Sequence, residues 1–292
     1  WGPPFVIGKD GENLSAAYYH SCNRGKRSIA IDFSTPEGAE TVRRLVATSD
    51  VLIENFKLGG LKKYGLDYDS LRKINPRLVY CSITGFGQDG PYAPRAGYDF
   101  IIQAMAGMMS ITGEPGREPQ KAGVAISDIF TGLYSVVAIQ AALRHADQTG
   151  QGQHIDLSLL DCSVALVAQR SCEYLIGDSP PGRIGNRTPG TAPGQLFRCA
   201  DGYLMVQAGG DRQFAALCRV MARPDLASDP RFATIQMRLV NIDALAEELE
   251  RTFVTKPGRQ WFDLLTEAGV LTAPVYDVPQ CFADPQVQAR GL

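Results

Sequence analysis

The stretch VLIENFKLGGLKKYGLDYDSLRKINPRLVYCSI, residues 51–83, carries the clearest signal of the fold class. It opens with an apolar run, VLIEN at 51–55, and closes with a second, RLVYCSI at 77–83. The segment between them predicts a short helix over 69–74. Apolar runs of this length, separated by a helix, are typical of parallel strands that are covered on both faces. The stretch therefore predicts an α/β fold with helices on a parallel sheet.

The residues before this stretch continue the same alternation. RSIAIDF, residues 27–33, alternates apolar and polar side chains and predicts a strand. It is followed by a helix-start signal, in which Ser34 or Thr35 is the cap and Pro36 the first helical residue. We expect this helix to end near residue 48.

The residues after it divide the chain in two. A loop rich in Gly and Pro at 84–99 leads to helices over 100–110 and 128–145, and QHIDLSLLD at 153–161 is a strand that runs into a helix. A second Gly- and Pro-rich loop precedes LFRCADGYLMVQA, residues 196–208, which predicts a hairpin with Asp201 and Gly202 at the turn. Helices near 211–221, 243–255 and 259–268 and a strand at 272–278 follow. We expect a large domain over 1–180, a linker over 181–195 and a small α+β domain over 196–292.

Composition excludes several classes of function. The 292 residues carry a formal net charge of −2 with no basic stripe, which argues against a nucleic-acid partner. No uninterrupted apolar run reaches the roughly 18 residues of a membrane span, so we expect no membrane partner. The seven cysteines form no CxxC pair and read as buried apolar residues of a reducing compartment. We predict a cytoplasmic protein, or a mitochondrial matrix protein in a eukaryote.

Metal, dinucleotide and serine-hydrolase sites are poorly supported. The three histidines have no ligand spacing to each other or to cysteine, so no metal is expected. GFGQDG at 85–90 matches GxGxxG, but a proline and a loop follow it instead of a helix. No GxSxG elbow occurs. Cys22 is the one cysteine near several cations, and a structural role suits it better than catalysis.

The acid Asp128 is the candidate for chemistry. It stands at the start of a long apolar segment, KAGVAISDIFTGLYSVVAIQAALRH at 121–145, and the apolar neighbours suggest partial burial. A helix N-terminus keeps a carboxylate ionised, and Gly132 one turn on leaves room beside it. Asp128 is therefore either a carboxylate nucleophile or a helix cap.

Basic and aromatic side chains follow the strand at 51–55. Asn55, Phe56 and Lys57 come directly after it, and Lys62 and Lys63 lie a few residues on. Open α/β sheets bind ligands at the carboxyl ends of their strands. Cations beside an aromatic ring suit a nucleotide with phosphates, although a solvated basic loop has the same composition.

Five blocks together resemble the family III CoA-transferases, the group of formyl-CoA and carnitine CoA-transferases. They are NRGKRSIAIDFSTPEG, VLIENFKLGGLKKYGLDYDSL, NPRLVYCSITGFGQDGPYAPRAGYDFIIQAMAG, GVAISDIFTGLYS and GQGQHIDLSLLD. The resemblance covers nearly the whole chain. It implies transfer of CoA from an acyl-CoA such as succinyl-CoA to a carboxylic acid, for example a dicarboxylate such as glutarate, with no metal and no permanently bound cofactor.

The resemblance also assigns roles and architecture. Asp128 matches the catalytic aspartate, which forms a covalent aspartyl intermediate. The implied contacts of coenzyme A are Ile31, Asp32, Phe33, Ser34, Asn55, Phe56, Lys57, Lys63, Ala96, Gly97, Tyr98 and Asp99. The implied fold is an interlocked homodimer with a Rossmann-like large domain and a small domain.

The chain departs from the family pattern in two respects. The family's first strand and helix and its returning C-terminal segment are absent, so we interpret the chain as a fragment of a longer protein. The glycine run that covers the aspartyl intermediate in formyl-CoA transferases is also absent, and AGGDRQ at 208–213 or the loop at 182–194 is the expected substitute.

Two other functions remain open. Racemases of α-methylacyl-CoA share this fold and use a histidine directly before the aspartate of GYD, where this chain has Tyr98. A tyrosine, with an ordinary pKa of about 10, is a poor partner for proton exchange at neutral pH. The second alternative is a non-catalytic CoA-binding subunit, which would have no use for an approachable nucleophile at position 128.

Overall fold

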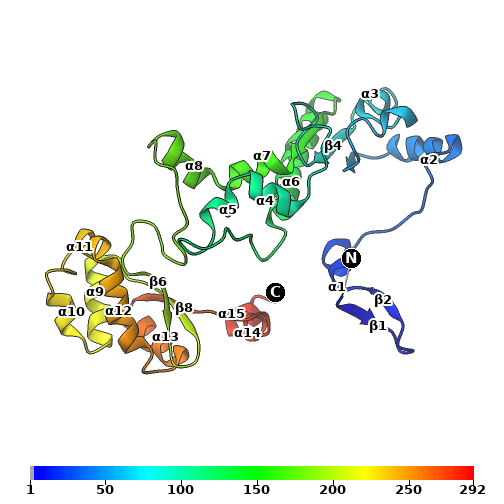
Figure 1. The fold of residues 1–292 in the computed structure, drawn as a ribbon. Helices are drawn as coiled ribbons and strands as arrows, with labels where there is room; N and C mark the ends of the chain where they lie inside the picture. Colours follow the sequence, from blue (N-terminus) through cyan, green and yellow to red (C-terminus); the bar gives the residue numbers. More distant parts are fainter. Residues whose placement is uncertain (1–2) are drawn as a thin grey trace. The chain divides into compact units, whose positions relative to one another are not determined.

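The computed structural model describes residues 3–292 and divides into two compact units (Figure 1). The first unit comprises Trp1–Gly97 and Asp128–Cys162, and the second comprises Tyr98–Ser127 and Ser163–Leu292. The chain therefore passes between the units three times. The predicted domain limits at 180 and 196 stay a prediction.

The first unit contains the predicted parallel sheet. Its strands β3 (Val51–Glu54), β4 (Val79–Thr84) and β5 (His154–Ser158) lie in the order β3-β4-β5, and both pairs are parallel. Cys81 at the centre pairs with Ile53 on one side and with Ile155 on the other. The mixed α/β class and the strands expected near 51–55 and 77–83 are confirmed.

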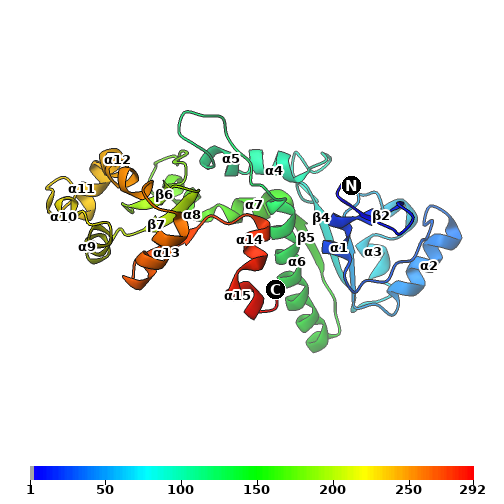
Figure 2. The same cartoon turned by 90° about the horizontal axis from the view of Figure 1, so that it is seen from below.

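Helices cover both faces of this sheet (Figure 2). On one face, Val79 and Cys81 pack against Ile139 and Ala142 of α6 (Ile126–Thr149). On the other face, Tyr80 packs with side chains from α2 (Pro36–Val46) and α3 (Tyr68–Leu71). Short connecting elements complete the unit: β1 (Phe5–Ile7), β2 (Asn13–Ala16), α1 (Ala17–Asn23) and the 3₁₀ turn η1 (Lys62–Tyr64).

The helix predicted after residue 35 is confirmed, but the prediction of a strand at 27–33 is wrong. The Thr35 hydroxyl accepts a hydrogen bond from the Gly38 N–H at 3.1 Å, which caps α2. Residues 27–33 follow no regular structure. An alternating segment becomes a strand only when another strand supplies its hydrogen-bond partners, and no segment of 3–292 pairs with this one.

Helix α6 corrects the expectation about membrane spans. Within the described residues it is the one helix long and apolar enough to cross a membrane, with a mean hydropathy of 1.5 over 18 residues. The sequence shows no uninterrupted apolar run here, because serines, Thr131 and Gln140 separate the apolar residues of α6. Since Ile139 and Ala142 are buried against β4, we assign α6 to the core of the α/β unit.

The second unit has its own sheet and core. Strands β6 (Gly194–Arg198), β7 (Tyr203–Gln207) and β8 (Leu271–Pro274) are antiparallel in that order, and the predicted hairpin is confirmed. Phe197 stacks on Phe253, which meets Trp261 edge to face. These three side chains lie in one buried cluster between the sheet and its helices.

The helices of the second unit agree closely with the predicted ranges. The three predicted in the small domain are α9 (Asp211–Val220), α12 (Ile242–Phe253) and α13 (Gly258–Glu267). The helix predicted over 100–110 is two helices, α4 (Asp99–Met105) and α5 (Met108–Ile111), because Gly107 between them has a φ of +85°. Further helices are α8 (Ala168–Leu175), α10 (Pro224–Ser228), α11 (Ile235–Val240), α14 (Val278–Ala283) and α15 (Pro285–Ala289), and α7 (Leu159–Leu166) spans the unit boundary.

Candidate active site

Asp128 lies in the first turn of α6, as predicted, and its side chain is exposed. The expectation of partial burial is therefore wrong. The apolar residues that suggested it, Ile129 and Leu133, are themselves more than half exposed. An exposed carboxylate beside the positive end of a 24-residue helix is stabilised as an anion and open to a substrate. Both properties suit a nucleophile.

The topology places Asp128 at the carboxyl edge of the parallel sheet. Helix α6 ends at Thr149 and β5 begins at His154, so the helix runs antiparallel to the strands and its first turn faces their carboxyl ends. Ile139 packs beside β4, and Asp128 precedes it by 11 residues, or roughly 16 Å of helix. Ligands of open α/β sheets bind at this edge.

A polar stripe anchors the first turns of α6. Ser127, Thr131 and Ser135 follow one another at four-residue spacing and are at most 5% exposed. The Ser163 hydroxyl donates to the Ser127 hydroxyl at 2.8 Å, and Thr131 hydrogen-bonds the Cys162 thiol. Gly132, in contrast, has open space where a β-carbon would be, so no side chain within the described residues fills the side of the helix that it leaves bare.

The implied contacts of coenzyme A from three segments come together in the first unit. The Phe33 ring lies edge to face with both Phe56 and Tyr64, each at a centroid distance of 5.5 Å. This aromatic cluster joins residues 31–34 to 55–57 and to Lys63, whose ammonium lies 4.7 Å from the centre of the Tyr64 ring. Lys57 and Lys63 are exposed, so both cations are available to phosphates.

Asp32 closes a tight turn within this cluster. Its Oδ1 accepts hydrogen bonds from the Ser34 hydroxyl at 2.6 Å and from the Ser34 N–H at 3.0 Å. These two bonds hold the pKa of Asp32 below its ordinary value. Asp32 and Ser34 are exposed, and Ile31 beside them is half-buried.

The implied contacts at 96–99 are divided between the two units. Gly97 packs against Gly85 at the end of β4, where a β-carbon on Gly85 would lie 2.5 Å from the Gly97 Cα. Tyr98 is 67% exposed. Asp99 is only 7% exposed, and its Oδ1 accepts a hydrogen bond from the Ser127 N–H at 2.7 Å. Ala96 is exposed.

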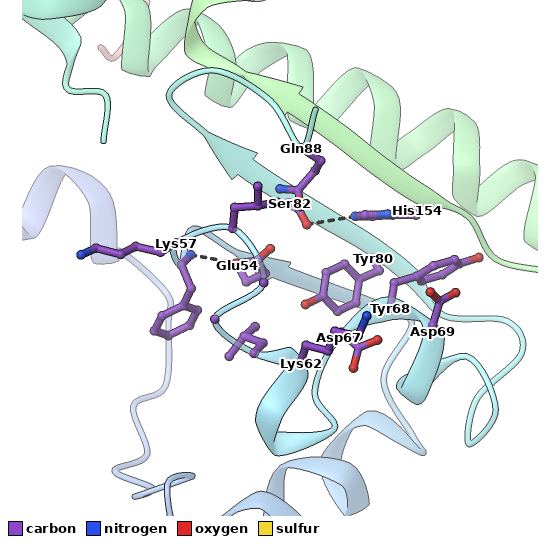
Figure 3. Close-up of a pocket in the computed structure, with 15 residues that line it drawn as sticks. Glu54, Lys57, Lys62, Asp67, Tyr68, Asp69, Tyr80, Ser82, Gln88 and His154 are labelled. Atoms are coloured by element: carbon purple, nitrogen blue, oxygen red, sulfur yellow. Dashed lines mark hydrogen bonds between the residues drawn. The ribbon is translucent and has the colours of Figure 1, made fainter. Parts of the chain in front are cut away.

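A pocket of about 300 Å³ lies on the polar face of the sheet (Figure 3). Phe56 and Lys57 line it, and the other implied contacts of coenzyme A do not. Lys62, which the sequence analysis named beside Lys63, also lines it. Sequence reasoning missed the remaining polar lining residues, which are Glu54, Asp67, Tyr68, Asp69, Tyr80, Ser82, Gln88 and His154. Alternation along β4 places Tyr80 and Ser82 on one face, but only the strand register places His154 opposite Tyr80.

Aromatic and hydroxyl groups fix the pocket wall. The Ser82 hydroxyl hydrogen-bonds His154 Nε2 at 3.0 Å, and the His154 ring stacks on Tyr68 at 5.1 Å. The Tyr80 hydroxyl donates to the Leu66 carbonyl at 3.1 Å, and burial raises the pKa of Tyr80. Within residues 3–292, no group of three or more histidines, cysteines and acids is arranged to hold a metal ion.

The two loops expected to replace the glycine run are joined to each other in the second unit. Arg238, which is fully buried, donates from Nε to the Ala192 carbonyl at 2.8 Å and from one terminal nitrogen to the Gly209 carbonyl at 2.7 Å. A β-carbon on Gly209 would lie 2.5 Å from Thr191 Cγ2. Burial of Arg238 could not be predicted from the sequence, since a single arginine in a helix is ordinarily a surface residue.

Comparison with known proteins places these observations in a family. The sequence profile of CoA-transferase family III matches residues 6–292. A succinate–glutarate CoA-transferase of Agrobacterium fabrum is 55% identical over the full chain, and the chain covers 73% of its length. A succinyl-CoA:glutarate CoA-transferase of Mus musculus is 39% identical over the full chain, which spans 66% of that protein, just under two thirds.

A solved structure agrees with the sequence comparison. The crystal structure of a CAIB/BAIF family protein from Brucella suis matches with a TM-score of 0.92 and 55% identity. The match covers 100% of this chain and 76% of that one.

Proposed function

The chain belongs to CoA-transferase family III, a family of enzymes, and we propose that it transfers CoA from succinyl-CoA to glutarate or a related dicarboxylate with Asp128 as the nucleophile. The substrates are those in the names of its relatives from Agrobacterium fabrum and Mus musculus. The observation that supports Asp128 as the nucleophile is that its carboxylate is exposed in the first turn of α6, at the carboxyl edge of the sheet.

The reaction begins at the thioester of the donor. An oxygen of the Asp128 carboxylate attacks the carbonyl carbon, the carbon–sulfur bond breaks, and CoA leaves as a thiolate. The product is a mixed anhydride between Asp128 and the donor acid. The thiolate then attacks the Asp128 carbonyl of this anhydride, which releases the donor acid as a carboxylate and leaves an aspartyl-CoA thioester.

The acceptor acid reverses these steps. Its carboxylate attacks the aspartyl thioester and forms a second anhydride, and the released thiolate attacks the acceptor carbonyl. The acceptor leaves as its CoA thioester, and Asp128 returns as a carboxylate. Each bond that breaks is a thioester or an anhydride, so the cycle consumes no ATP.

The cluster of Phe33, Phe56 and Tyr64 with Lys57 and Lys63 supports binding of the nucleotide end of CoA. Rings and exposed ammonium groups suit an adenine and phosphates. Racemisation is a weaker proposal because position 98 holds an exposed tyrosine instead of histidine. A non-catalytic binding role gives no reason for an approachable acid at position 128.

The apolar face of α6 supports the proposed interlocked homodimer. Ile129, Leu133, Val136 and Val137 are 52–70% exposed on one helix. Exposed apolar patches of this kind mark interaction surfaces. We propose that a second copy of the chain covers these four side chains. We also propose that the first unit is Rossmann-like. A cytoplasmic location is a separate proposal. Light scattering of the full-length protein that gives only a monomer would argue against the dimer.

The experiment uses the full-length protein with succinyl-CoA and a panel of dicarboxylates, comparing the wild type with Asp128→Ala. Hydroxylamine traps activated acyl groups, and the mass of the Asp128 peptide shows where it has reacted. We expect a hydroxamate at Asp128 in the wild type and loss of transfer in the variant. Undiminished transfer by Asp128→Ala, without any adduct, would leave Asp128 a helix residue only.

A further inference from the structure

Asp99 is a buried acid for which the transfer steps have no use. It is the first residue of α4 and is 7% exposed. Burying a carboxylate is costly unless hydrogen bonds or opposite charge compensate for it. Both carboxylate oxygens of Asp99 accept hydrogen bonds within the second unit, and the donors of these bonds indicate the role of the acid.

The first oxygen binds the start of α6. Asp99 Oδ1 accepts the Ser127 N–H at 2.7 Å, from a residue 28 positions along the chain. The first N–H groups of a helix have no partner within the helix. Asp99 therefore supplies from α4 the acceptor that a local capping residue usually supplies. The positive end of α6 in turn stabilises the negative charge of Asp99.

The second oxygen is held by Gln103. Asp99 Oδ2 accepts a hydrogen bond from Gln103 Nε2 at 2.5 Å, one turn further along α4. The Gln103 Oε1 accepts the Ala122 N–H at 2.9 Å, and Gln103 is fully buried. The carboxylate is thus fixed from two sides, which gives it a single orientation toward Ser127.

Ser127 is the residue directly before Asp128. Its side chain is also held, since its hydroxyl accepts from the Ser163 hydroxyl at 2.8 Å. With both its N–H and its hydroxyl bound, the backbone that leads into Asp128 has little freedom. Nucleophilic attack depends on the position of the attacking oxygen to within about an ångström.

We propose that Asp99 is a positioning residue that fixes the first turn of α6, and through it the attacking carboxylate of Asp128, and that it is not a contact of coenzyme A. The proposal rests on the proposed function, because it gives Asp99 a purpose only if Asp128 is the nucleophile. It replaces the role in CoA binding that the family resemblance implied for this residue.

Two conservative variants separate geometry from charge. Asp99→Asn keeps the size of the side chain and an oxygen that accepts from the Ser127 N–H, but it removes the charge and replaces the acceptor of the Gln103 Nε2 hydrogen bond by a second donor. Asp99→Glu keeps the charge and adds one methylene, which displaces the carboxylate in a buried site. Ser110→Ala is the control, because it removes a side-chain hydrogen bond of the second unit, to the Gly107 carbonyl, that does not involve Ser127.

The measurements are kcat, KM for succinyl-CoA and the yield of the Asp128 hydroxamate in the full-length enzyme. We expect Asp99→Glu to lower kcat and the hydroxamate yield by roughly 10- to 100-fold with KM for succinyl-CoA unchanged within about twofold. We expect Asp99→Asn, which keeps an acceptor for the Ser127 N–H, to stay within about fivefold of the wild-type kcat, and Ser110→Ala to stay within about twofold.

The opposite pattern would overturn the proposal. A raised KM with unchanged kcat in Asp99→Glu and Asp99→Asn would make Asp99 a contact of CoA. A lower thermal midpoint with wild-type kcat below that midpoint would make its role structural only. Asp128→Ala in the same series keeps the two proposals apart, since full transfer by that variant means that the nucleophile itself is wrong.

Discussion

Gly85 and Gly97 lie so close that a β-carbon on Gly85 would be 2.5 Å from the Gly97 Cα. Gly85 directly follows β4, so this contact holds the backbone of Gly97 at the carboxyl edge of the sheet. No side-chain rotation can relieve the overlap, because the atoms that clash belong to the backbone.

Substituting Gly85 therefore has a packing cost that a glycine in open space does not have. We expect Gly85→Ala to lower the free energy of unfolding by about 1–3 kcal/mol and to reduce transfer activity, because the backbone at 97 must move. Urea unfolding and steady-state kinetics measure the two effects. Gly123→Ala is the control, since nothing lies within 4 Å of its added carbon. Equal behaviour of the two variants would contradict the packing argument.

For Gly132 we expect the opposite effect of an alanine substitution on stability. It lies inside α6, where glycine costs about 1 kcal/mol relative to alanine, and open space surrounds its missing side chain. We expect Gly132→Ala to raise the free energy of unfolding by about 0.5–1 kcal/mol and to lower kcat severalfold, because the added methyl group would occupy the space beside Asp128 that we propose for the substrate. A more stable variant with full activity would mean that the space serves no reaction.

Lys57 and Lys63, the cations near the Phe33 cluster, are expected to strengthen binding of the acyl-CoA. We expect Lys57→Ala and Lys63→Ala each to raise KM for the acyl-CoA by about tenfold, which corresponds to about 1.4 kcal/mol, with kcat unchanged. The effect should shrink as salt is added. Lys73→Ala, an exposed lysine outside the pocket and the implied contact set, is the control. A similar KM for all three variants would remove these lysines from the site.

Among the substitutions considered, we expect replacement of Arg238 to lower the free energy of unfolding most. Its guanidinium is fully buried and donates to the Ala192, Phe232 and Gly209 carbonyls and to the Asp211 carboxylate. We expect Arg238→Ala to cost about 3–5 kcal/mol, because three buried carbonyls lose their donor. Arg238→Lys should recover only part of this, since an ammonium cannot reproduce the planar fork. Thermal and urea unfolding test both variants, and a loss below 1 kcal/mol in Arg238→Ala would contradict the assignment.

The buried thiols predict a loss of stability at alkaline pH. Burial, helped by nearby acids, raises the pKa of Cys81 and of Cys218 from 9.0 to about 11. The folded state therefore holds these protons more tightly than the unfolded state, so the contribution is complete below pH 9 and is lost as pH rises through 11. Urea midpoints between pH 8 and 11 should fall less in Cys81→Ala and Cys218→Ala than in the wild type. Identical slopes would contradict the prediction.

The same burial predicts which cysteines react. Cys22, Cys172 and Cys281 are exposed, whereas Cys81, Cys162, Cys199 and Cys218 are buried. We expect an alkylating reagent at pH 8 to label only the first three in the native protein, as read by peptide mass spectrometry. Rapid labelling of Cys81 would show that the core opens readily.

Elements whose signals are local could be predicted from the sequence. The apolar runs on either side of 56–76 indicated β3 and β4, the Thr35–Pro36 signal began α2, and the Asp201–Gly202 turn closed a hairpin. Asp128 at the start of a helix was predictable for the same reason, because capping and helical periodicity act over a few residues.

Features that depend on distant partners could be established only from the folded chain. Residues 27–33 have strand-like alternation but no strand beside them, and an edge without a partner stays irregular. The register of β5 brought His154 to Ser82, and packing brought Asp99 to Ser127 and Arg238 to Ala192. Such contacts join residues 28 to 72 positions apart, and local propensity carries no information about which distant polar group will satisfy a buried donor or acceptor.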